Sequence, residues 1–208
     1  MDTKIALSDK ELEMVCNTDW ILTKHAIIQK VYKLFGEMLP LFEKTVNENK
    51  KYLPAEVFIN SPKISKGENY KLLPYVMLDY PRYFGKDETV AIRTFFWWGN
   101  FFSVSLQLSG SCKTNALEVL HQNFEWLQQN EYCICINDNP WEHHFDTNNF
   151  AHINTIDKNK FTEILLRNRV VKIAKNIPLN KWQDAPEFIL KVFSELAGLL
   201  KNGQAPKR

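Results

Sequence analysis

The sequence predicts an α+β fold: a single domain in which helices pack mainly on one face of an antiparallel sheet of roughly five strands. Three observations predict this fold. Of the 208 residues, 45% are apolar and 24% charged, which is typical of one globular domain. Apolar residues recur at helical spacing towards both ends of the chain, and they alternate with polar residues in its middle. We expect the domain to span residues 1–203 and a flexible tail to follow at residues 204–208.

Helical segments are predicted by caps and by apolar residues spaced three and four apart. Ser8 and Glu11 have the spacing of a capping box, so a short helix should follow Ser8. A longer helix should come next, and Gly36 and Pro40 should kink or split it. The later expected helices cover residues 114–129, 157–168 and 184–203.

Strands are predicted where β-branched and aromatic residues alternate with polar ones between turn-forming residues. The expected strands are residues 55–60, 75–80, 90–98, 101–109, 132–136 and 169–177. Residues 61–69 should form a loop, because turn-forming residues are concentrated there. Pro81 has no backbone donor, so the second strand should stop at Tyr80.

The strongest local prediction is a hairpin in which residues 90–98 and 101–109 flank a Gly-Asn pair suited to a tight turn. A two-residue turn would place Arg93 opposite Leu106, on the apolar face of the sheet. A guanidinium cannot lose its proton, so a buried one requires an anionic partner. Arg93 should therefore form an internal ion pair, extend past the sheet edge, or bind the carboxylate or phosphate of a ligand. The candidate internal partners are Asp79, Glu142 and Asp146.

The charge balance argues against several classes of protein. A net charge of +2 and a pI of about 8.2 are too mild for a nucleic-acid-binding surface. No segment has the length and apolarity of a signal peptide or of a membrane span. Without a secretion signal, the four cysteines should be reduced thiols. We therefore expect a soluble cytoplasmic protein that binds neither nucleic acid nor a membrane.

Residues 141–146, Trp-Glu-His-His-Phe-Asp, form the densest cluster of potential metal ligands, and His152 follows them. Imidazole and carboxylate groups bind zinc, iron or manganese, and three converging ligands with an open position would make a hydrolytic site. In an extended segment, His144 and Asp146 share a face and His143 does not. His144, Asp146 and His152 are therefore the candidate metal ligands. The alternative is an exposed polar loop in which one histidine packs its ring.

Cys133 and Cys135 lie two positions apart on an expected strand, so both sulfur atoms should face the same side. Their spacing is not that of a zinc motif, and the sequence has no second pair. We therefore expect two buried thiols that pack as small apolar groups.

Residues 68–74 read Glu-Asn-Tyr-Lys-Leu-Leu-Pro, and residues 169–200 join an expected strand to an expected helix. These two segments resemble the YktB-like proteins, a bacterial family whose function is not established. The first resembles that family's Gly-Tyr-Lys stretch, which a proline and a sheet strand follow, with Asn69 in place of the glycine. The second resembles the family's closing strand and helix. The resemblance implies an α+β fold and a bacterial origin, and it implies no chemistry.

The sequence supports three functional hypotheses, and it assigns no cofactor and no catalytic residue. The first is a binding module for a small or extended ligand on an aromatic-rich sheet face. Its candidate ligand-binding residues are Arg93, Trp97, Trp98, Phe96, Phe101 and Tyr80. The second is a metal-dependent hydrolase that uses the loop at residues 141–152. The third is a structural or interaction protein that buries its aromatic surface in a homodimer.

Overall fold

The structure, a computed structural model, describes residues 5–137 and 139–200. Within these residues, seven strands form one antiparallel sheet in the order β1-β2-β3-β4-β7-β5-β6. The predicted α+β class and antiparallel pairing are confirmed, although the sheet has seven strands instead of about five. The strands are Lys63–Tyr70 (β1), Leu73–Phe84 (β2), Thr89–Trp97 (β3), Phe101–Ser109 (β4), Cys133–Cys135 (β5), Phe150–His152 (β6) and Val171–Pro178 (β7).

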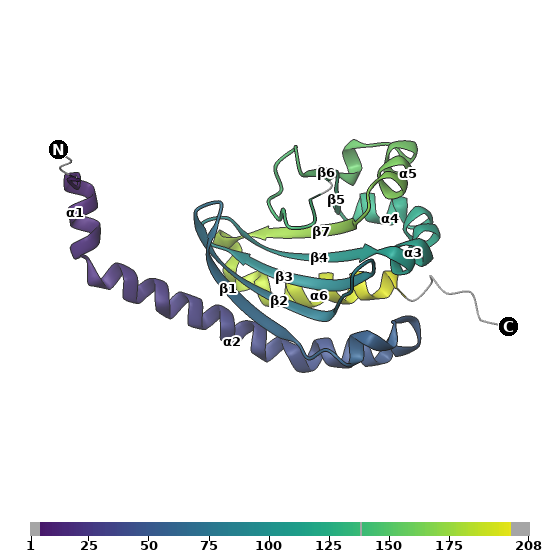
Figure 1. Ribbon diagram of the computed structural model, residues 1–208, viewed down its shortest axis with the longest axis horizontal. Helices are drawn as coiled ribbons and strands as arrows, with labels where there is room; N and C mark the ends of the chain where they lie inside the picture. Colours follow the sequence, from purple (N-terminus) through teal and green to yellow (C-terminus); the bar gives the residue numbers. More distant parts are fainter. Residues whose placement is uncertain (1–4, 138, 201–208) are drawn as a thin grey trace.

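Helices α2 and α6 pack against each other and cover one face of the sheet, whereas α3, α4 and α5 lie at one end of it (Figure 1). Figure 1 also shows that α1 and the beginning of α2 project away from the rest of the molecule. The helices are Asp9–Cys16 (α1), Thr18–Glu48 (α2), Gly110–Gln122 (α3), Phe124–Gln129 (α4), Lys158–Arg167 (α5) and Ala185–Leu199 (α6). Short 3₁₀ segments lie at Lys50–Tyr52 (η1), Ala55–Phe58 (η2), Ile153–Thr155 (η3) and Leu179–Asp184 (η4).

The hydrophobic core lies between the sheet and the two helices α2 and α6. Alternate residues of β3 and β4 point into it, among them Ile92, Phe96 and Leu106, each 1% exposed. From the helices, Phe42 of α2 and Phe193 of α6 stack with their ring centroids 3.7 Å apart. Burying a side chain of this size stabilises the fold by about 1.5–3 kcal/mol. The apolar residues of β3 and β4 therefore determine which face the helices cover.

Helix α2 is continuous over 31 residues, so the split expected at Gly36 and Pro40 does not occur. Pro40 removes the hydrogen bond to the Gly36 carbonyl, a loss of about 3 kcal/mol in a helix interior. On both sides of the proline, Val31, Phe35 and Phe42 recur at helical spacing and are at most 1% exposed. Burial of this apolar stripe outweighs the loss, and the helix continues through the proline.

Two segments near the first strands have structures that differ from those predicted. Residues 61–69, expected as a loop, belong mostly to β1, the edge strand of the sheet. An edge strand is paired on one side only, so it tolerates Gly67 and the exposed polar residues that indicated a turn. Residues 55–60, expected as a strand, contain the 3₁₀ segment η2. Val57 is buried there, whereas Ile59, which would share its face in a strand, is 81% exposed.

Strand β2 does not stop at Tyr80 but continues to Phe84, so the predicted boundary is wrong. The Tyr80–Pro81 peptide bond is cis. Pairing with β3 is irregular between Asp79 and Arg82, and pairing with β1 ends at Asp79. Pro81 therefore lies at a bulge, where β2 has lost one of its two neighbours, and such a position tolerates a missing backbone donor.

The hairpin between β3 and β4 is confirmed, but its register differs by one residue from the prediction. Trp97 pairs with Phe101, which leaves residues 98–100 in the turn. Arg93 consequently lies opposite Ser105 rather than Leu106. A slip of one residue exchanges the two faces of a strand. Arg93 therefore shares its face with serines instead of leucines.

The helix expected over residues 114–129 is divided into α3 and α4 at Asn123. The side chain of Asn123 donates to the carbonyl of Val119, a bond that competes with continuation of the helix. The end expected near Gly203 and the tail at residues 204–208 lie outside the described residues. Among the described residues, the structure contains no helix with the length and apolarity that a membrane crossing requires.

Candidate functional site

The face of the sheet opposite α2 and α6 carries buried polar side chains from three adjacent strands. Ser103, Ser105 and Gln107 of β4 lie beside Arg93 of β3 and Lys172 of β7, and all five are at most 6% exposed. We call these five residues the polar face. Residues 139–149, which we call the strap, connect β5 to β6 and lie over it. Buried polar groups require partners, and the strap supplies hydrogen-bond partners for Arg93 and Lys172 of the polar face.

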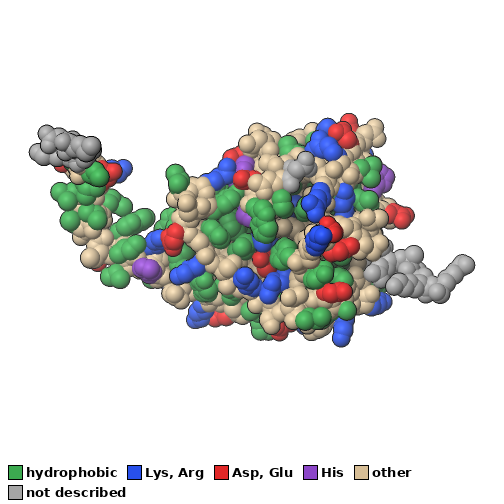
Figure 2. All heavy atoms as spheres, in the orientation of Figure 1, with side chains coloured by type: hydrophobic (Ala, Val, Ile, Leu, Met, Phe, Trp, Pro, Cys, Tyr) green, Lys and Arg blue, Asp and Glu red, His purple; other side chains and the backbone are tan. Residues whose placement is uncertain are grey.

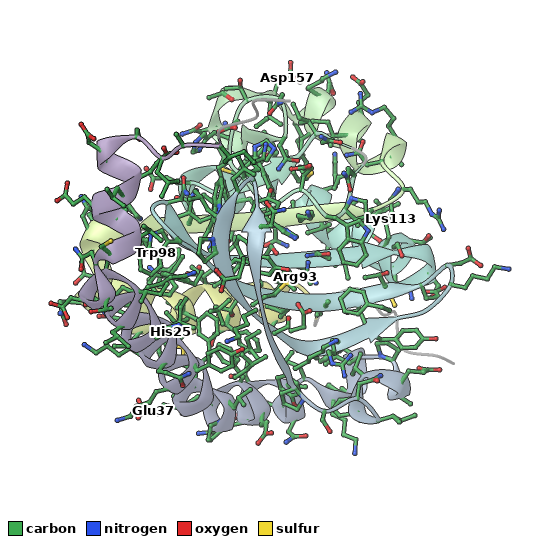
Figure 3. The ribbon with its side chains drawn as sticks, turned by 60° about the vertical axis from the view of Figure 1, so that its left-hand side comes forward. His25, Glu37, Arg93, Trp98, Lys113 and Asp157 are labelled. Carbon is green, nitrogen blue, oxygen red and sulfur yellow. The ribbon has the colours of Figure 1, made fainter. Side chains whose placement is uncertain are left out.

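Arg93 lies over the middle strands of the sheet (Figure 3). Its Nε and Nη2 donate to the two carboxylate oxygens of Asp79 on β2, at 2.7 and 2.9 Å. Asp79 was one of the three internal partners expected for Arg93, and this ion pair is therefore confirmed. The remaining terminal nitrogen, Nη1, lies 3.2 Å from Nε2 of His143 in the strap.

His143 is a neutral acceptor in this arrangement. Arginine can only donate hydrogen bonds, so Nε2 of His143 must accept and the ring proton must lie on Nδ1. Burial, with a smaller contribution from the neighbouring charges of Lys172 and Arg93, holds the pKa of His143 well below its usual range. The strap therefore presents an uncharged ring to a cationic polar face.

Lys172 is a buried cation that holds the strap through backbone groups. Its ammonium donates to the carbonyl oxygens of Pro140 and Glu142, at 2.8 and 2.7 Å. In the part of the chain that the structure describes, no carboxylate lies within ion-pair distance of it. Burial lowers the pKa of Lys172 to about 8. An ammonium has three donors, so two bonds to the strap leave one donor for a further partner.

Tyr70, the last residue of β1, fastens the strap from the other side of the polar face. Its hydroxyl oxygen accepts the backbone N–H groups of His143 and His144, at 2.6 and 3.0 Å. Its O–H donates to Oε2 of Glu142 at 3.1 Å. Burial raises the pKa of Tyr70 to about 12, so the hydroxyl keeps the proton that it donates.

A cavity of about 10 Å³ remains between the strap and the polar face, which is the space of about one water molecule. Its lining residues are Arg93, Phe95, Ser103, Ser105, His143, Phe145, Phe150, Lys172 and Ala174. Neither Ser103 nor Ser105 has a hydrogen-bond partner for its hydroxyl among the described residues. Beside the cavity, Nε2 of the buried Gln107 also has no partner within that part of the chain. The site therefore offers more polar groups than the protein itself satisfies.

Aromatic rings surround the cavity on the same face of the sheet. Phe95 lies 5.0 Å from the ring of His143 and 5.7 Å from that of Tyr70, measured between centroids. In the strap, Phe145 stacks on Phe150 at 4.6 Å. These rings exclude water from the polar groups, which strengthens every electrostatic contact in the cavity.

The six residues expected to bind a ligand are divided between the two faces of the sheet. Arg93, Trp97 and Phe101 lie on the strap side, where Phe101 contacts Phe145. Phe96, Trp98 and Tyr80 lie on the helix side and pack against the hydrophobic core. Figure 3 shows Trp98 close to α2 and apart from Arg93. The structure therefore does not bring the six together into one surface.

The three candidate metal ligands also do not form one group. His144 lies between Glu142 and Asp146, with nitrogen-to-oxygen distances of 3.1 Å on each side. The contact from Nδ1 to Asp146 has the distance but not the angle of a hydrogen bond. His152 instead lies 3.4 Å from the sulfur of Cys133. Among the described residues, no three potential ligands are placed to hold a metal ion.

The histidine loop is more buried than the sequence indicated. His143 is 9% exposed and His144 only 2%, whereas the alternative to a metal site was an exposed loop with one packed histidine ring. Cys133 and Cys135 are both buried and share a face, as predicted, while Ile134 between them packs into the main core. Cys135 also donates to the carbonyl of Asn137, at the point where the chain leaves β5 for the strap.

Comparison of the chain with protein-family models, with curated proteins and with solved structures gives no match. The function must therefore be inferred from the site itself.

Sequence reasoning missed Lys172, Tyr70, Ser103 and Ser105 as parts of the site. A signal was present for Lys172, because the segment Val-Lys-Ile-Ala places a single lysine within an apolar run of a strand. The serines also lie at alternate positions of β4, opposite the core residues. No local pattern indicated Tyr70, since its partners are more than 70 residues away in the chain.

Proposed function

We propose that this protein is a binding module that takes a small anionic ligand, such as a carboxylate, into the polar cavity beneath the strap. The observation that carries the proposal is the placement of Lys172. Lys172 lines the cavity, its ammonium donates two of its three hydrogen bonds to the strap, and no carboxylate lies within ion-pair distance of it among the described residues. An anionic group in the cavity would supply the missing acceptor.

The charges around the cavity favour an anion over a neutral or cationic ligand. Asp79 neutralises Arg93, and the neutral ring of His143 adds no charge, whereas Lys172 interacts with the charge of Glu142 but has no carboxylate within ion-pair distance among the described residues. The hydroxyls of Ser103 and Ser105 add two donors without partners. A buried, hydrogen-bonded charge pair is a strong contact when both partners are desolvated.

The size of the cavity limits the ligand and gives the strap a role. A space of about 10 Å³ holds one water molecule, so a ligand of several atoms requires the strap to move outwards. The strap is attached by hydrogen bonds that Tyr70 accepts and Lys172 donates, and these bonds can exchange for bonds to water or to the ligand. The rings of Phe95, Phe145 and Phe150 would then contact the apolar part of the ligand.

Calorimetric titration with formate, acetate and inorganic phosphate tests the proposal. At least one of these anions should bind the wild-type protein, and Lys172→Gln should abolish that binding. Lys175→Gln is the matched control, because Lys175 lies on the same strand but on the opposite face. Ser105→Ala keeps the charge of the cavity and should weaken binding without abolishing it. Absence of binding by all three anions, or equal binding by wild type and Lys172→Gln, would refute the proposal.

A further inference from the structure

A pair of chemically reactive side chains lies at the β6 edge of the sheet, where β6 pairs with β5. Cys133 of β5 and His152 of β6 are directly paired, so their side chains share a face. The sulfur of Cys133 lies 3.4 Å from Nδ1 of His152. The hydroxyl of Thr155 donates to the carbonyl of His152 at 2.7 Å, which holds the histidine backbone where β6 ends. The sheet therefore brings together a nucleophile and a base that are 19 residues apart in the chain.

Both side chains line a surface pocket of about 360 Å³, a volume within the range of small-molecule sites. Cys133 is only 2% exposed, so a reactant must enter the pocket to contact its thiol, whereas His152 is exposed. The pocket therefore offers a route to a thiol that is otherwise buried. The other residues that line it are Glu131, Asn154, Thr155, Lys175 and Asn176.

The thiol of Cys133 is neutral and donates to the ring of His152. Burial raises the pKa of this thiol to about 12, so the sulfur keeps its proton at neutral pH. Nδ1 of His152 then accepts, and the ring proton lies on Nε2. A buried thiol without a base is inert, whereas a neighbouring imidazole can take the proton as the sulfur attacks. The reactivity of Cys133 therefore depends on His152.

We propose that Cys133 and His152 are a nucleophile and its general base, and that the pocket binds a small activated acyl compound, an ester or a thioester. The thiol attacks the carbonyl carbon while its proton passes to Nδ1 of His152. A bond forms between sulfur and carbon, the bond from that carbon to the leaving oxygen or sulfur breaks, and the leaving group takes the proton from Nδ1. Water then cleaves the new thioester with His152 as the base, which releases a carboxylic acid and restores the thiol.

The polar lining of the pocket supports an acyl substrate. The side-chain amides of Asn154 and Asn176 have no hydrogen-bond partner among the described residues. Amide N–H groups stabilise the negative charge that develops on a carbonyl oxygen during acyl transfer. Glu131 and Lys175 carry opposite charges, so the lining favours a short, uncharged acyl group. None of these residues belongs to the polar face, and the proposal is therefore independent of anion binding beneath the strap.

Hydrolysis of p-nitrophenyl acetate by the full chain tests the proposal, because release of p-nitrophenolate measures the acylation step. Every sample carries Cys16→Ser, since Cys16 is an exposed thiol that would react on its own. Cys16 ends α1, which projects away from the body of the molecule (Figure 2), so its replacement should leave the pocket intact. This protein should hydrolyse the ester, and Cys133→Ala should abolish the hydrolysis. Absence of hydrolysis above the rate in buffer, or its persistence in Cys133→Ala, would overturn the proposal.

His152→Gln tests the base without disturbing the core, because His152 is exposed. Loss of a general base slows a reaction by about 10²- to 10⁴-fold, and release of p-nitrophenolate should slow by this factor. His121→Gln and Cys112→Ala are the matched controls and should keep the full rate. His121 is also exposed but lies on α3, and Cys112 is more exposed than Cys133 but lies beside the carboxylate of Glu88. Equal rates for His152→Gln and His121→Gln would overturn the role of His152.

Discussion

Arg93 and Asp79 lie directly opposite each other on β3 and β2, and the guanidinium donates to both carboxylate oxygens, at 2.7 and 2.9 Å. The two residues are 2% and 5% exposed. Because this pair is internal, Arg93 does not need a ligand for charge balance. It provides instead a fixed donor for His143, and thereby positions the strap over the cavity.

Replacing Arg93 by methionine should lower the free energy of unfolding of the ligand-free protein by about 3–5 kcal/mol, because it leaves Asp79 buried without a counter-charge. Unfolding in urea measures the change. The double variant Arg93→Met with Asp79→Leu should regain most of the loss, since it removes both charges. A single variant as stable as wild type would show that the ion pair does not support the fold.

Replacing Tyr70 by phenylalanine should loosen the strap. The change leaves two backbone N–H groups of the strap and the carboxylate of Glu142 without their common partner, at a cost of about 1–3 kcal/mol. Amide hydrogen exchange at His143 and His144 should become faster by about 5- to 150-fold, the factor that corresponds to this cost. Tyr75→Phe is the control, because the ring of Tyr75 lies on the same face and contacts Phe95. Equal exchange in the two variants would mean that Tyr70 does not hold the strap.

The sequence predicted the class of fold and most of the elements, because these depend on local signals. Ser8 and Asp157 cap α1 and α5 as expected, and the hydrophobic alternation of β4 identifies the core side of the sheet. Two of the wrong predictions, the loop at residues 61–69 and the end of β2 at Tyr80, depend on position in the sheet. β1 is polar because it is an edge, and β2 passes Pro81 because one of its neighbours ends there. Edge position is a property of topology, which a local pattern does not contain.

The site was harder to predict than the fold, because one residue of register decides which side chains meet. A turn of two residues would have grouped Arg93 with Leu106, whereas the observed turn groups it with Ser105. The loop at residues 141–152 was identified as a candidate metal site, but His143 contacts Arg93 instead, and the described residues contain no group placed to hold a metal ion. The partners of Lys172 are two backbone carbonyls, and backbone carbonyls have no sequence signature.

Lys172 should make stability depend on alkaline pH. Its pKa is about 8 in the folded protein and 10.5 when free, so between these values the unfolded chain binds more protons than the native one. The free energy of unfolding therefore rises with pH over this range, by about 3 kcal/mol from this lysine. Urea unfolding of wild type and Lys172→Met from pH 7 to 10.5 measures this change in the free energy of unfolding. Because Lys172→Met has no ammonium to bury, the free energy of unfolding of the variant minus that of wild type should decrease as the pH rises. A difference that stays constant from pH 7 to 10.5 would contradict a lowered pKa for Lys172.

His143 should make stability fall in mild acid. Its pKa is lowered by burial, so below about pH 6.5 the unfolded chain takes up a proton that the native ring does not. The free energy of unfolding should therefore decrease as the pH falls from 7 to 5, and His143→Gln should show a smaller decrease. His25→Gln, which changes an exposed histidine of α2, is the control. The same acid dependence in wild type and His143→Gln would exclude this role.

The proposed function depends on the protonated ammonium of Lys172, which binds an anion beneath the strap. The most direct test is the dissociation constant for formate or acetate, whichever binds more tightly, measured by calorimetry from pH 6.5 to 10 at constant ionic strength, because neither anion changes its charge over this range. Since binding requires the ammonium, the Kd should be constant below about pH 8 and then weaken about tenfold for each pH unit. A Kd that does not change between pH 7 and 10 would contradict the claim.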